Sequence, residues 1–177
     1  MDNTVKIATF PRHGHLVTAF FPNIWEMFKR KEVYHLQEEQ ILSFKGKKYS
    51  GEEKLIDIDY LENKSDYISY GIDVLDFVQP DFLFFKDNKF LQNQNGLRTI
   101  GIPDLVVEVW SINNDKEERE FKTRLYSSSN KCEHWYLEQD SNYVKCMIGD
   151  TILPTQNLHE VLLTQKGIRF DLRNLAL

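Results

Sequence analysis

The chain has 177 residues, of which 41% are hydrophobic and 28% are charged, and its formal net charge is -5 at neutral pH. This length accommodates one domain with a sizeable core, and the composition excludes disordered, collagen-like and disulfide-rich proteins. The apolar runs fall far short of the roughly 20 residues that span a bilayer, and no secretory signal opens the chain. We therefore expect a cytoplasmic protein without membrane segments.

The first predicted helix covers residues 15–31. Leu16, Phe20 and Ile24 recur at helical spacing, and a basic end at 29–31 suits the negative end of the helix dipole. The pattern therefore predicts an amphipathic helix that packs on a core.

The next two segments give weaker signals. Residues 33–44 are compatible with a strand pair or with a short helix, and the pattern does not decide between them. Residues 45–73 are polar and charged, with three glycines and no lasting periodicity. Such a stretch predicts a long loop or hairpin excursion.

The second half of the chain alternates clearer strands with one helix. Apolar runs rich in β-branched and aromatic residues, separated by turn-forming residues, predict two neighbouring strands at 74–85 and 101–111. A helix follows at 115–126, and later strands are predicted at 132–139, 142–148 and 167–172. The order of helix, strands, helix and strands predicts an α/β layer arrangement.

Three acidic residues interrupt the runs that otherwise indicate buried strands. Asp81 and Asp104 each follow a proline, a position where an aspartate often serves only the backbone of a turn. Glu108 lies in the middle of LVVEVW and has no such role. An unpaired buried carboxylate costs several kcal/mol, so Glu108 requires a proton, a cationic partner or a metal.

Lys122 supplies a basic group on the helix that follows these strands. It lies four residues after Glu118, which alone predicts a solvated ion pair worth roughly 0.2 to 0.5 kcal/mol. Its neighbours Leu125 and Tyr126 nevertheless put its stem at the edge of the apolar face. Acids on adjacent strands with a nearby lysine suit metal-assisted phosphodiester cleavage, in which carboxylates hold Mg²⁺ and the lysine helps to position the attacking water.

These residues, together with their order along the chain, resemble a known family. The similarity is to the Uma-two restriction-endonuclease family of the PD-(D/E)xK nuclease superfamily, and it rests on the ordered set Pro80-Asp81, Pro103-Asp104, Glu108, Ser111, Asp115, Lys122, Tyr126 and Trp135. The resemblance implies a single restriction-endonuclease-like domain over residues 1–177, with a central mixed β-sheet flanked by helices.

The same resemblance implies roles for individual residues. Asp81 and Glu108 would be the metal ligands, for Mg²⁺ or alternatively Mn²⁺, and Lys122 would be the catalytic lysine. Asp104 would be an auxiliary acid at the edge of the site. His15 would open the first helix, as a histidine does in the family.

Two departures from the family pattern stand out. The superfamily's lysine normally lies two residues after the glutamate, where this chain has Trp110, so activity depends on Lys122 reaching in from the helix. The excursion at 45–73 does not match the family closely. Glu26 is a candidate for an acid from the N-terminal part, and a solvated helix face is the alternative for it.

Two functions from different classes follow. The first is a metal-dependent DNA endonuclease, and the alternative is a catalytically inactive nuclease-fold module that binds nucleic acid or a protein partner, with Glu108 and Lys122 as a buried structural pair. Basic clusters at 29–31 and 45–48 could contact DNA phosphates or be solvated surface. Cleavage of both strands would be helped by a homodimer.

Overall fold

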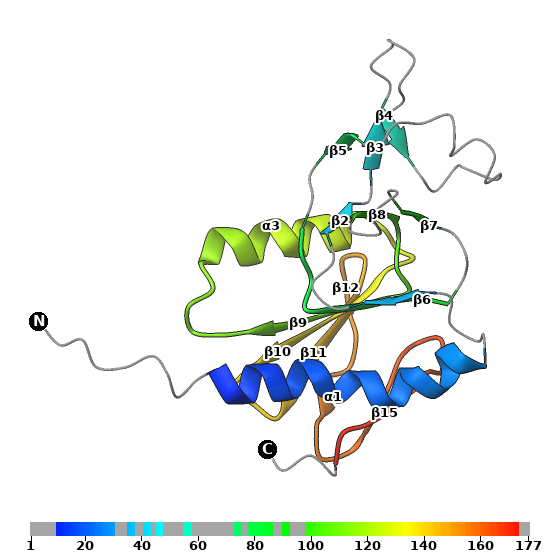
Figure 1. Cartoon of the computed structure of the whole chain (residues 1–177). Helices are drawn as coiled ribbons and strands as arrows, with labels where there is room; N and C mark the ends of the chain where they lie inside the picture. Colours follow the sequence, from blue (N-terminus) through cyan, green and yellow to red (C-terminus); the bar gives the residue numbers. More distant parts are fainter. Residues whose placement is uncertain are drawn as a thin grey trace, which may run out of the picture.

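The computed structural model of the chain describes residues 10–30, 35–37, 41–43, 45–47, 55–57, 73–75, 78–86, 90–92 and 98–173. A mixed sheet lies at its centre (Figure 1). The strand order is β1–β6–β9–β10–β11–β12, and β13 also pairs with β11. The bounds are β1 His35–Gln37, β6 Phe82–Phe85, β9 Leu105–Trp110, β10 Glu133–Glu138, β11 Tyr143–Ile148, β12 Thr151–Ile152 and β13 Gln156–Asn157.

The sheet is mixed because one pair of neighbours runs parallel. β9 and β10 are parallel, with Glu108 opposite Tyr136, and α3 (Lys116–Ser127) connects them. The remaining neighbours in this sheet are antiparallel, including β6 and β9, which the sequence predicted to be adjacent. The predicted central mixed sheet with flanking helices is therefore confirmed.

The two described helices cover opposite faces of this sheet. α1 (Phe10–Lys29) lies on one face and α3 on the other (Figure 1). Because strand side chains alternate between faces, Phe82 and Val107 pack with Phe20 of α1, whereas Leu83 and Val106 belong to the core beneath α3. Full burial of each such side chain stabilises the fold by about 1.5 to 3 kcal/mol. The same alternation turns Glu108 towards α3.

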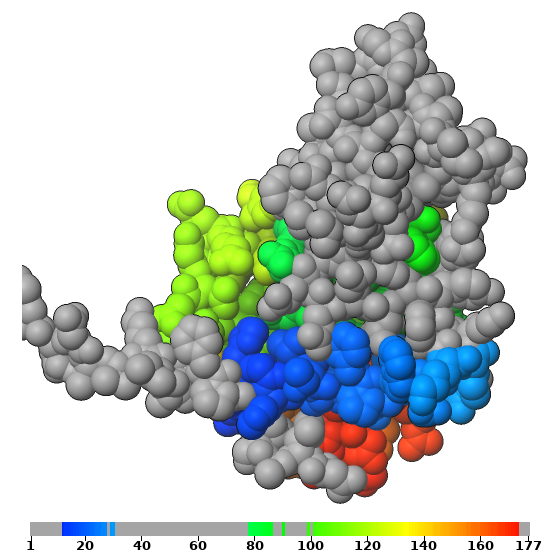
Figure 2. Space-filling view, in the orientation of Figure 1, coloured from blue at the N-terminus to red at the C-terminus, as the bar shows by residue number. Residues whose placement is uncertain are grey.

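A C-terminal hairpin completes the layer that contains α1. β14 (Val161–Leu163) and β15 (Arg169–Asp171) pair antiparallel, and β15 lies beside α1 (Figure 2). The side chain of Asn23 accepts the backbone N–H of Asp171 at 2.9 Å, which ties the helix to the hairpin. The predicted strand at 167–172 is therefore confirmed with shorter bounds.

Two small sheets account for the segments with weak sequence signals. β2 (Ile41–Ser43) pairs parallel with β8 (Arg98–Gly101), which also pairs with β7 (Phe90–Gln92). β3 (Lys45–Lys47) lies between β4 (Leu55–Asp57) and β5 (Asp73–Leu75) in an antiparallel sheet. The described parts of 33–44 are thus strands, although they pair with β6 and β8 rather than with each other. Much of the 45–73 excursion lies outside the described residues.

The helix boundaries differ slightly from the predicted ones. α1 begins at Phe10, so the expectation that His15 opens this helix is wrong. α3 begins after Asp115, whose carboxylate caps it by accepting the backbone N–H of Glu117 at 2.6 Å. Within the described part of the chain, no helix has both the length and the apolar character that crossing a membrane requires.

Candidate functional site

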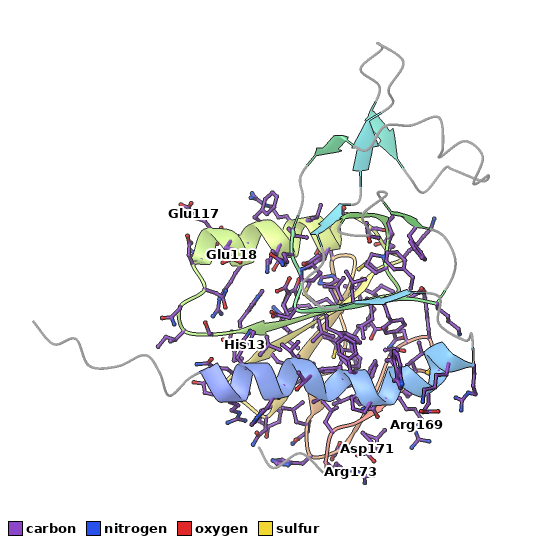
Figure 3. All side chains as sticks on the ribbon, in the orientation of Figure 1. His13, Glu117, Glu118, Arg169, Asp171 and Arg173 are labelled. Carbon is purple, nitrogen blue, oxygen red and sulfur yellow. The ribbon has the colours of Figure 1, made fainter. Side chains whose placement is uncertain are left out.

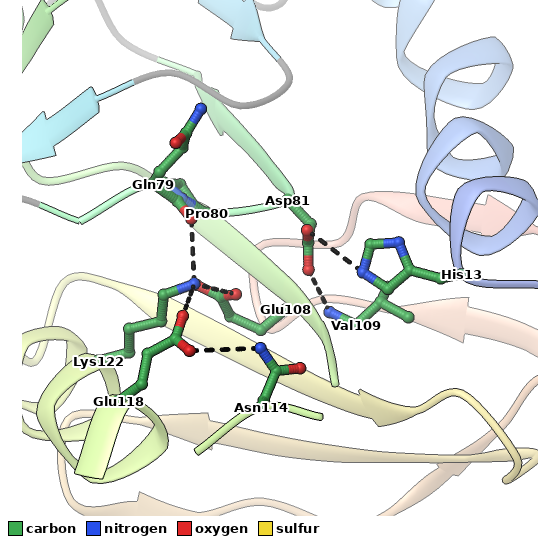
Figure 4. Close-up of a pocket in the computed structure, with 9 residues that line it drawn as sticks. All are labelled: His13, Gln79, Pro80, Asp81, Glu108, Val109, Asn114, Glu118 and Lys122. Atoms are coloured by element: carbon green, nitrogen blue, oxygen red, sulfur yellow. Dashed lines mark hydrogen bonds and ion pairs between the residues drawn. The ribbon is translucent and has the colours of Figure 1, made fainter. Parts of the chain in front are cut away.

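A pocket of about 280 Å³ opens beside the C-terminal half of β9, between the beginning of α1 and the first turns of α3 (Figure 4). His13 of α1 and Glu118 of α3 lie at the same end of the molecule, on opposite sides of the sheet (Figure 3). We call this the acidic pocket. Its lining residues are His13, Gln79, Pro80, Asp81, Glu108, Val109, Asn114, Glu118 and Lys122.

Asp81 is held at the start of β6 by contacts with two neighbouring elements. Its Oδ2 accepts the backbone N–H of Val109 at 2.6 Å, and its Oδ1 lies 3.5 Å from Nε2 of His13. The hydrogen bond with Asp81 raises the pKa of His13, although partial burial opposes this shift. The backbone bond from β9 therefore fixes the carboxylate of Asp81 beside the neighbouring residue Glu108.

Glu108 lies on β9 with only 1% of its surface exposed. Both carboxylate oxygens are occupied: Oε2 accepts from Nζ of Lys122 at 2.8 Å, and Oε1 accepts from the hydroxyl of Tyr126 at 2.5 Å. Burial raises the pKa of Glu108 to about 7; the charge of Lys122 opposes this shift and the charge of Asp81 adds to it. Burial beside another acid is the environment in which a carboxylate gains most from a cation.

Lys122 reaches the acidic pocket from the middle of α3. Besides Glu108, its Nζ donates to the backbone carbonyl of Gln79 at 3.0 Å and lies 3.5 Å from Oε1 of Glu118. Burial is the largest single influence and lowers the pKa of Lys122, but the charge of Glu108, its hydrogen bond and the charges of Asp81 and Glu118 together outweigh burial and raise this pKa. The lysine therefore stays protonated at neutral pH, and these three oxygens match the three donors of its ammonium group.

The turn between β9 and α3 fixes the direction of the helix. The side chain of Asn114 accepts the backbone N–H of Ser111 at 2.8 Å, and its amide donates to Oε2 of Glu118 at 3.4 Å. Arg119 donates to the carbonyl of Ser111 at 2.7 Å. These contacts clamp the first turns of α3 onto the end of β9, which holds Lys122 over Glu108.

Trp110 lies on β9 two residues after Glu108. It occupies the position where the superfamily's lysine normally lies, on the same face of β9 as Glu108. Its ring stacks on Tyr136 with centroids 4.4 Å apart, and the guanidinium of Arg119 lies 4.7 Å from the Trp110 centroid. The packing thus fills this position with an aromatic side chain, and the lysine that lines the acidic pocket is Lys122 of α3.

The structure brings together three of the four predicted site residues. Asp81, Glu108 and Lys122 line the acidic pocket, but Asp104 does not. Asp104 precedes β9 at its other end, where it pairs with Lys166 and accepts the backbone N–H of Lys86 at 2.5 Å.

Glu26 also lies elsewhere. It is exposed on α1 and pairs with Lys29 at 2.8 Å, in agreement with the solvated alternative. Arg30 is exposed at the end of the same helix, and Lys31 and Lys48 lie outside the described residues.

Six of the nine residues that line the acidic pocket were not predicted as site residues, and three of these carry side chains that bond to the predicted ones or to each other. These three are His13, Asn114 and Glu118. A signal for His13 was present, because it lies three residues before Leu16 and thus continues the apolar stripe of α1. His15, which the family resemblance suggested, is exposed.

The donor atoms of the acidic pocket fit a hard divalent cation. Carboxylate oxygens from Asp81 and Glu108 are the ligands that Mg²⁺ prefers. Within the described ranges, no group of three acidic, histidine or cysteine side chains is arranged to hold a metal without further ligands. Mg²⁺ commonly takes one or two protein carboxylates and completes its shell with water and substrate oxygens, so the two carboxylates suit it.

The chain is similar to a known protein family and to a protein of known crystal structure. The Uma2 family model, described as "putative restriction endonuclease", matches residues 61–174. A crystal structure from Anabaena variabilis ATCC 29413, described as a "putative nuclease belonging to DUF820", aligns with a TM-score of 0.57 over 92% of this chain and 80% of that chain. The sequence identity is 13%, so this likeness shows a shared fold. No curated protein matches the chain significantly.

Proposed function

The chain belongs to the Uma2 family, whose model matches more than half of its residues, and we propose that it is a metal-dependent DNA endonuclease that hydrolyses phosphodiester bonds. One observation carries the proposal: Asp81, Glu108 and Lys122, which are far apart in sequence, line the same pocket. Two carboxylates and an ammonium group around one cavity provide the groups that phosphodiester hydrolysis uses.

Asp81 and Glu108 would hold Mg²⁺, or Mn²⁺ in its place. The bound cation would polarise the scissile phosphate and lower the pKa of a bound water. Glu108 would be ionised in this state, and it would hold the cation through the oxygen that accepts from Lys122 in the structure, Oε2. Asp81 is pre-oriented for the same task by the N–H of Val109 at 2.6 Å.

Lys122 would act on the phosphate or on the attacking water. Its Nζ is held by Glu108 and by the Gln79 carbonyl, and more loosely, at 3.5 Å, by Glu118. The side chain of Glu118 is 46% exposed, against 1% for Glu108, so the contact with Glu118 is easier to exchange for a phosphate oxygen than the contact with Glu108. The ammonium group would then stabilise the negative charge that develops during hydrolysis.

The charge of the acidic pocket makes substrate binding depend on the cation. Asp81, Glu108 and Glu118 bring three carboxylates, against one ammonium group on Lys122 and a histidine, His13. Such a pocket repels a phosphate until a divalent cation neutralises it. We further propose duplex DNA as the substrate and a two-fold symmetric homodimer as the form that cuts both strands, the latter on mechanistic grounds alone.

One observation favours the alternative, an inactive nuclease-fold module that binds nucleic acid or a protein partner. All three donors of Lys122 face oxygens, and Glu108 is paired on both of its oxygens, so the residues also form a closed structural network. In that case Glu108 and Lys122 would stabilise the fold and would not take part in chemistry.

Cleavage of supercoiled plasmid DNA separates the two functions. The wild type is incubated with Mg²⁺ or Mn²⁺ and with a chelator, beside Asp81→Asn and the matched control Asp104→Asn, whose carboxylate lies outside the acidic pocket. The proposal predicts metal-dependent cleavage that Asp81→Asn abolishes and Asp104→Asn retains. A wild type that is inactive with both metals on duplex and single-stranded DNA contradicts it.

A further inference from the structure

Tyr126 shares the carboxylate of Glu108 with Lys122. It follows Lys122 by one turn of α3, so both side chains project from the same face of the helix. Lys122 contacts Oε2 of Glu108 at 2.8 Å, and the hydroxyl of Tyr126 donates to the other oxygen, Oε1, at 2.5 Å. Tyr126 itself does not line the acidic pocket.

The two donors differ in how firmly they are held. Tyr126 is fully buried, and its ring packs in the core beneath α3 with Val106 and Tyr136. A ring in a close-packed core fixes the position of its hydroxyl. Lys122, in contrast, carries its ammonium group on a flexible four-carbon stem that ends in the acidic pocket. Glu108 therefore has one fixed partner and one that is able to move.

The two donors also differ in charge. A cation that binds Glu108 is repelled by the ammonium group of Lys122, but not by the neutral hydroxyl of Tyr126. When Lys122 turns to the substrate, Glu108 still requires a partner for its inner oxygen, because it is almost entirely buried. The hydroxyl of Tyr126 meets this requirement without competing with the cation.

We propose that Tyr126 is a positioning residue that anchors Oε1 of Glu108, so that Oε2 is presented to a divalent cation while Lys122 acts on the substrate. This inference rests on the nuclease function proposed above and extends it to a residue outside the pocket. Tyr126 acts through Glu108 and touches neither the cation nor the phosphate. Partners of this kind orient metal-binding side chains, and their loss typically weakens metal affinity or activity on the order of 10- to 100-fold.

The test compares two substitutions that each delete one buried tyrosine hydroxyl. Tyr126→Phe removes the hydroxyl on Glu108, and the control Tyr136→Phe removes one that lies 2.7 Å from Nδ1 of His134. Binding of Mn²⁺ to the whole chain is measured by calorimetry without DNA. The rise of the thermal unfolding midpoint with Mn²⁺ is a second readout, which remains measurable on a destabilised variant. Plasmid cleavage is followed as a function of Mn²⁺ concentration.

The proposal predicts that Tyr126→Phe weakens Mn²⁺ binding on the order of 10- to 100-fold and reduces the metal-induced rise of the unfolding midpoint. The Mn²⁺ concentration at half-maximal cleavage should rise by a similar factor, whereas Tyr136→Phe should leave it unchanged. Equal effects of both substitutions, or wild-type Mn²⁺ binding by Tyr126→Phe, overturn the role of Tyr126 and leave the nuclease function standing. A wild type that neither binds Mn²⁺ nor cleaves DNA overturns both.

Discussion

Replacement of Lys122 by methionine tests the buried ion pair of the acidic pocket most sharply. Methionine retains most of the apolar stem and removes the ammonium group that lies 2.8 Å from Glu108. Breaking a buried pair by removing one partner costs about 3 to 5 kcal/mol, because the other charge stays buried. Glu108 retains the hydroxyl of Tyr126, so we expect the lower end of this range, about 3 kcal/mol. Equilibrium unfolding in urea measures the loss.

A second substitution separates the charge from the packing. In the double variant Glu108→Gln with Lys122→Met, no charge is left without a partner, so most of the stability should return, to within about 1 kcal/mol of the wild type. The matched control is Lys116→Met, which removes an exposed lysine of the same helix and should change the free energy of unfolding by less than about 0.5 kcal/mol. A Lys122→Met variant as stable as the control would refute the reasoning about the buried pair.

The geometry implies this stability loss whether or not the protein is an enzyme. Lys122 is bonded to a buried carboxylate in the resting structure, so destabilisation alone does not distinguish a catalytic lysine from a structural one. Cleavage does distinguish them. The double variant should regain stability yet remain inactive if Lys122 and Glu108 take part in the chemistry.

Three further predictions concern the metal, pH and backbone strain. A hundredfold excess of Mg²⁺ over its dissociation constant should stabilise the wild type by about 2.7 kcal/mol. In differential scanning fluorimetry, Asp81→Asn should lose this stabilisation and Asp104→Asn should keep it; equal stabilisation of both variants would contradict the proposed metal site. Burial lowers the pKa of His134 to about 4 from 6.5, so the unfolded state binds its proton first and stability should fall by about 2 kcal/mol from pH 7 to pH 5; urea unfolding of His134→Gln should show a shallower pH dependence, and an unchanged slope would exclude this histidine as the cause. Gly149 has φ 52°, and a Cβ there would lie 2.0 Å from a neighbouring side-chain oxygen, so Gly149→Ala should destabilise by about 1 to 2 kcal/mol, whereas Gly14→Ala, in open space within α1, should not destabilise in the same unfolding experiment.

The central strands and α3 were predictable because their signals are local. β9 is an apolar run that only Glu108 interrupts, and β10 carries the run Trp135-Tyr136-Leu137; each strand is buried over five consecutive residues, as expected for strands that are covered on both faces. The predicted helix at 115–126 matches α3 to within one residue at each end, and the residue predicted as its first, Asp115, is its N-cap. The start of α1 was missed, although Pro11 is compatible with the first turn of a helix.

The small sheets were not predictable in the same way. Their strands are three or four residues long, too short for a periodic pattern to emerge. β2 pairs with β8, which lies far along the chain, so the pairing depends on the tertiary fold. For this reason the sequence pattern did not decide whether residues 33–44 form strands or a helix.

The candidate site was predictable where a residue violates its local context. Glu108 stood out because it interrupts an apolar strand, and it proved to be the most buried acid of the acidic pocket. Asp104 shares its strand face by alternation, but it lies four residues away, a distance of roughly 13 Å along a strand. Sequence spacing alone therefore does not reveal that α3 covers Glu108 and leaves Asp104 outside the acidic pocket.

The partners of the acids depend on packing between distant elements. His13 meets Asp81 only because α1 lies against the sheet near the end of β9, and Tyr126 meets Glu108 only because α3 crosses above it. No local sequence pattern predicts either of these two side-chain contacts. The resemblance to the family included Tyr126, but the role proposed for it here comes from the hydrogen bond at 2.5 Å.

The rate of plasmid cleavage in Mg²⁺ by the wild type and by Lys122→Met, measured side by side with folded protein, tests the central claim most directly. We predict cleavage by the wild type that a chelator abolishes, together with a loss of at least about a hundredfold for Lys122→Met at saturating Mg²⁺. Metal-dependent cleavage that is equally fast in both proteins would contradict the assignment of Lys122 to the chemistry. Absence of cleavage by the wild type would contradict the proposed nuclease.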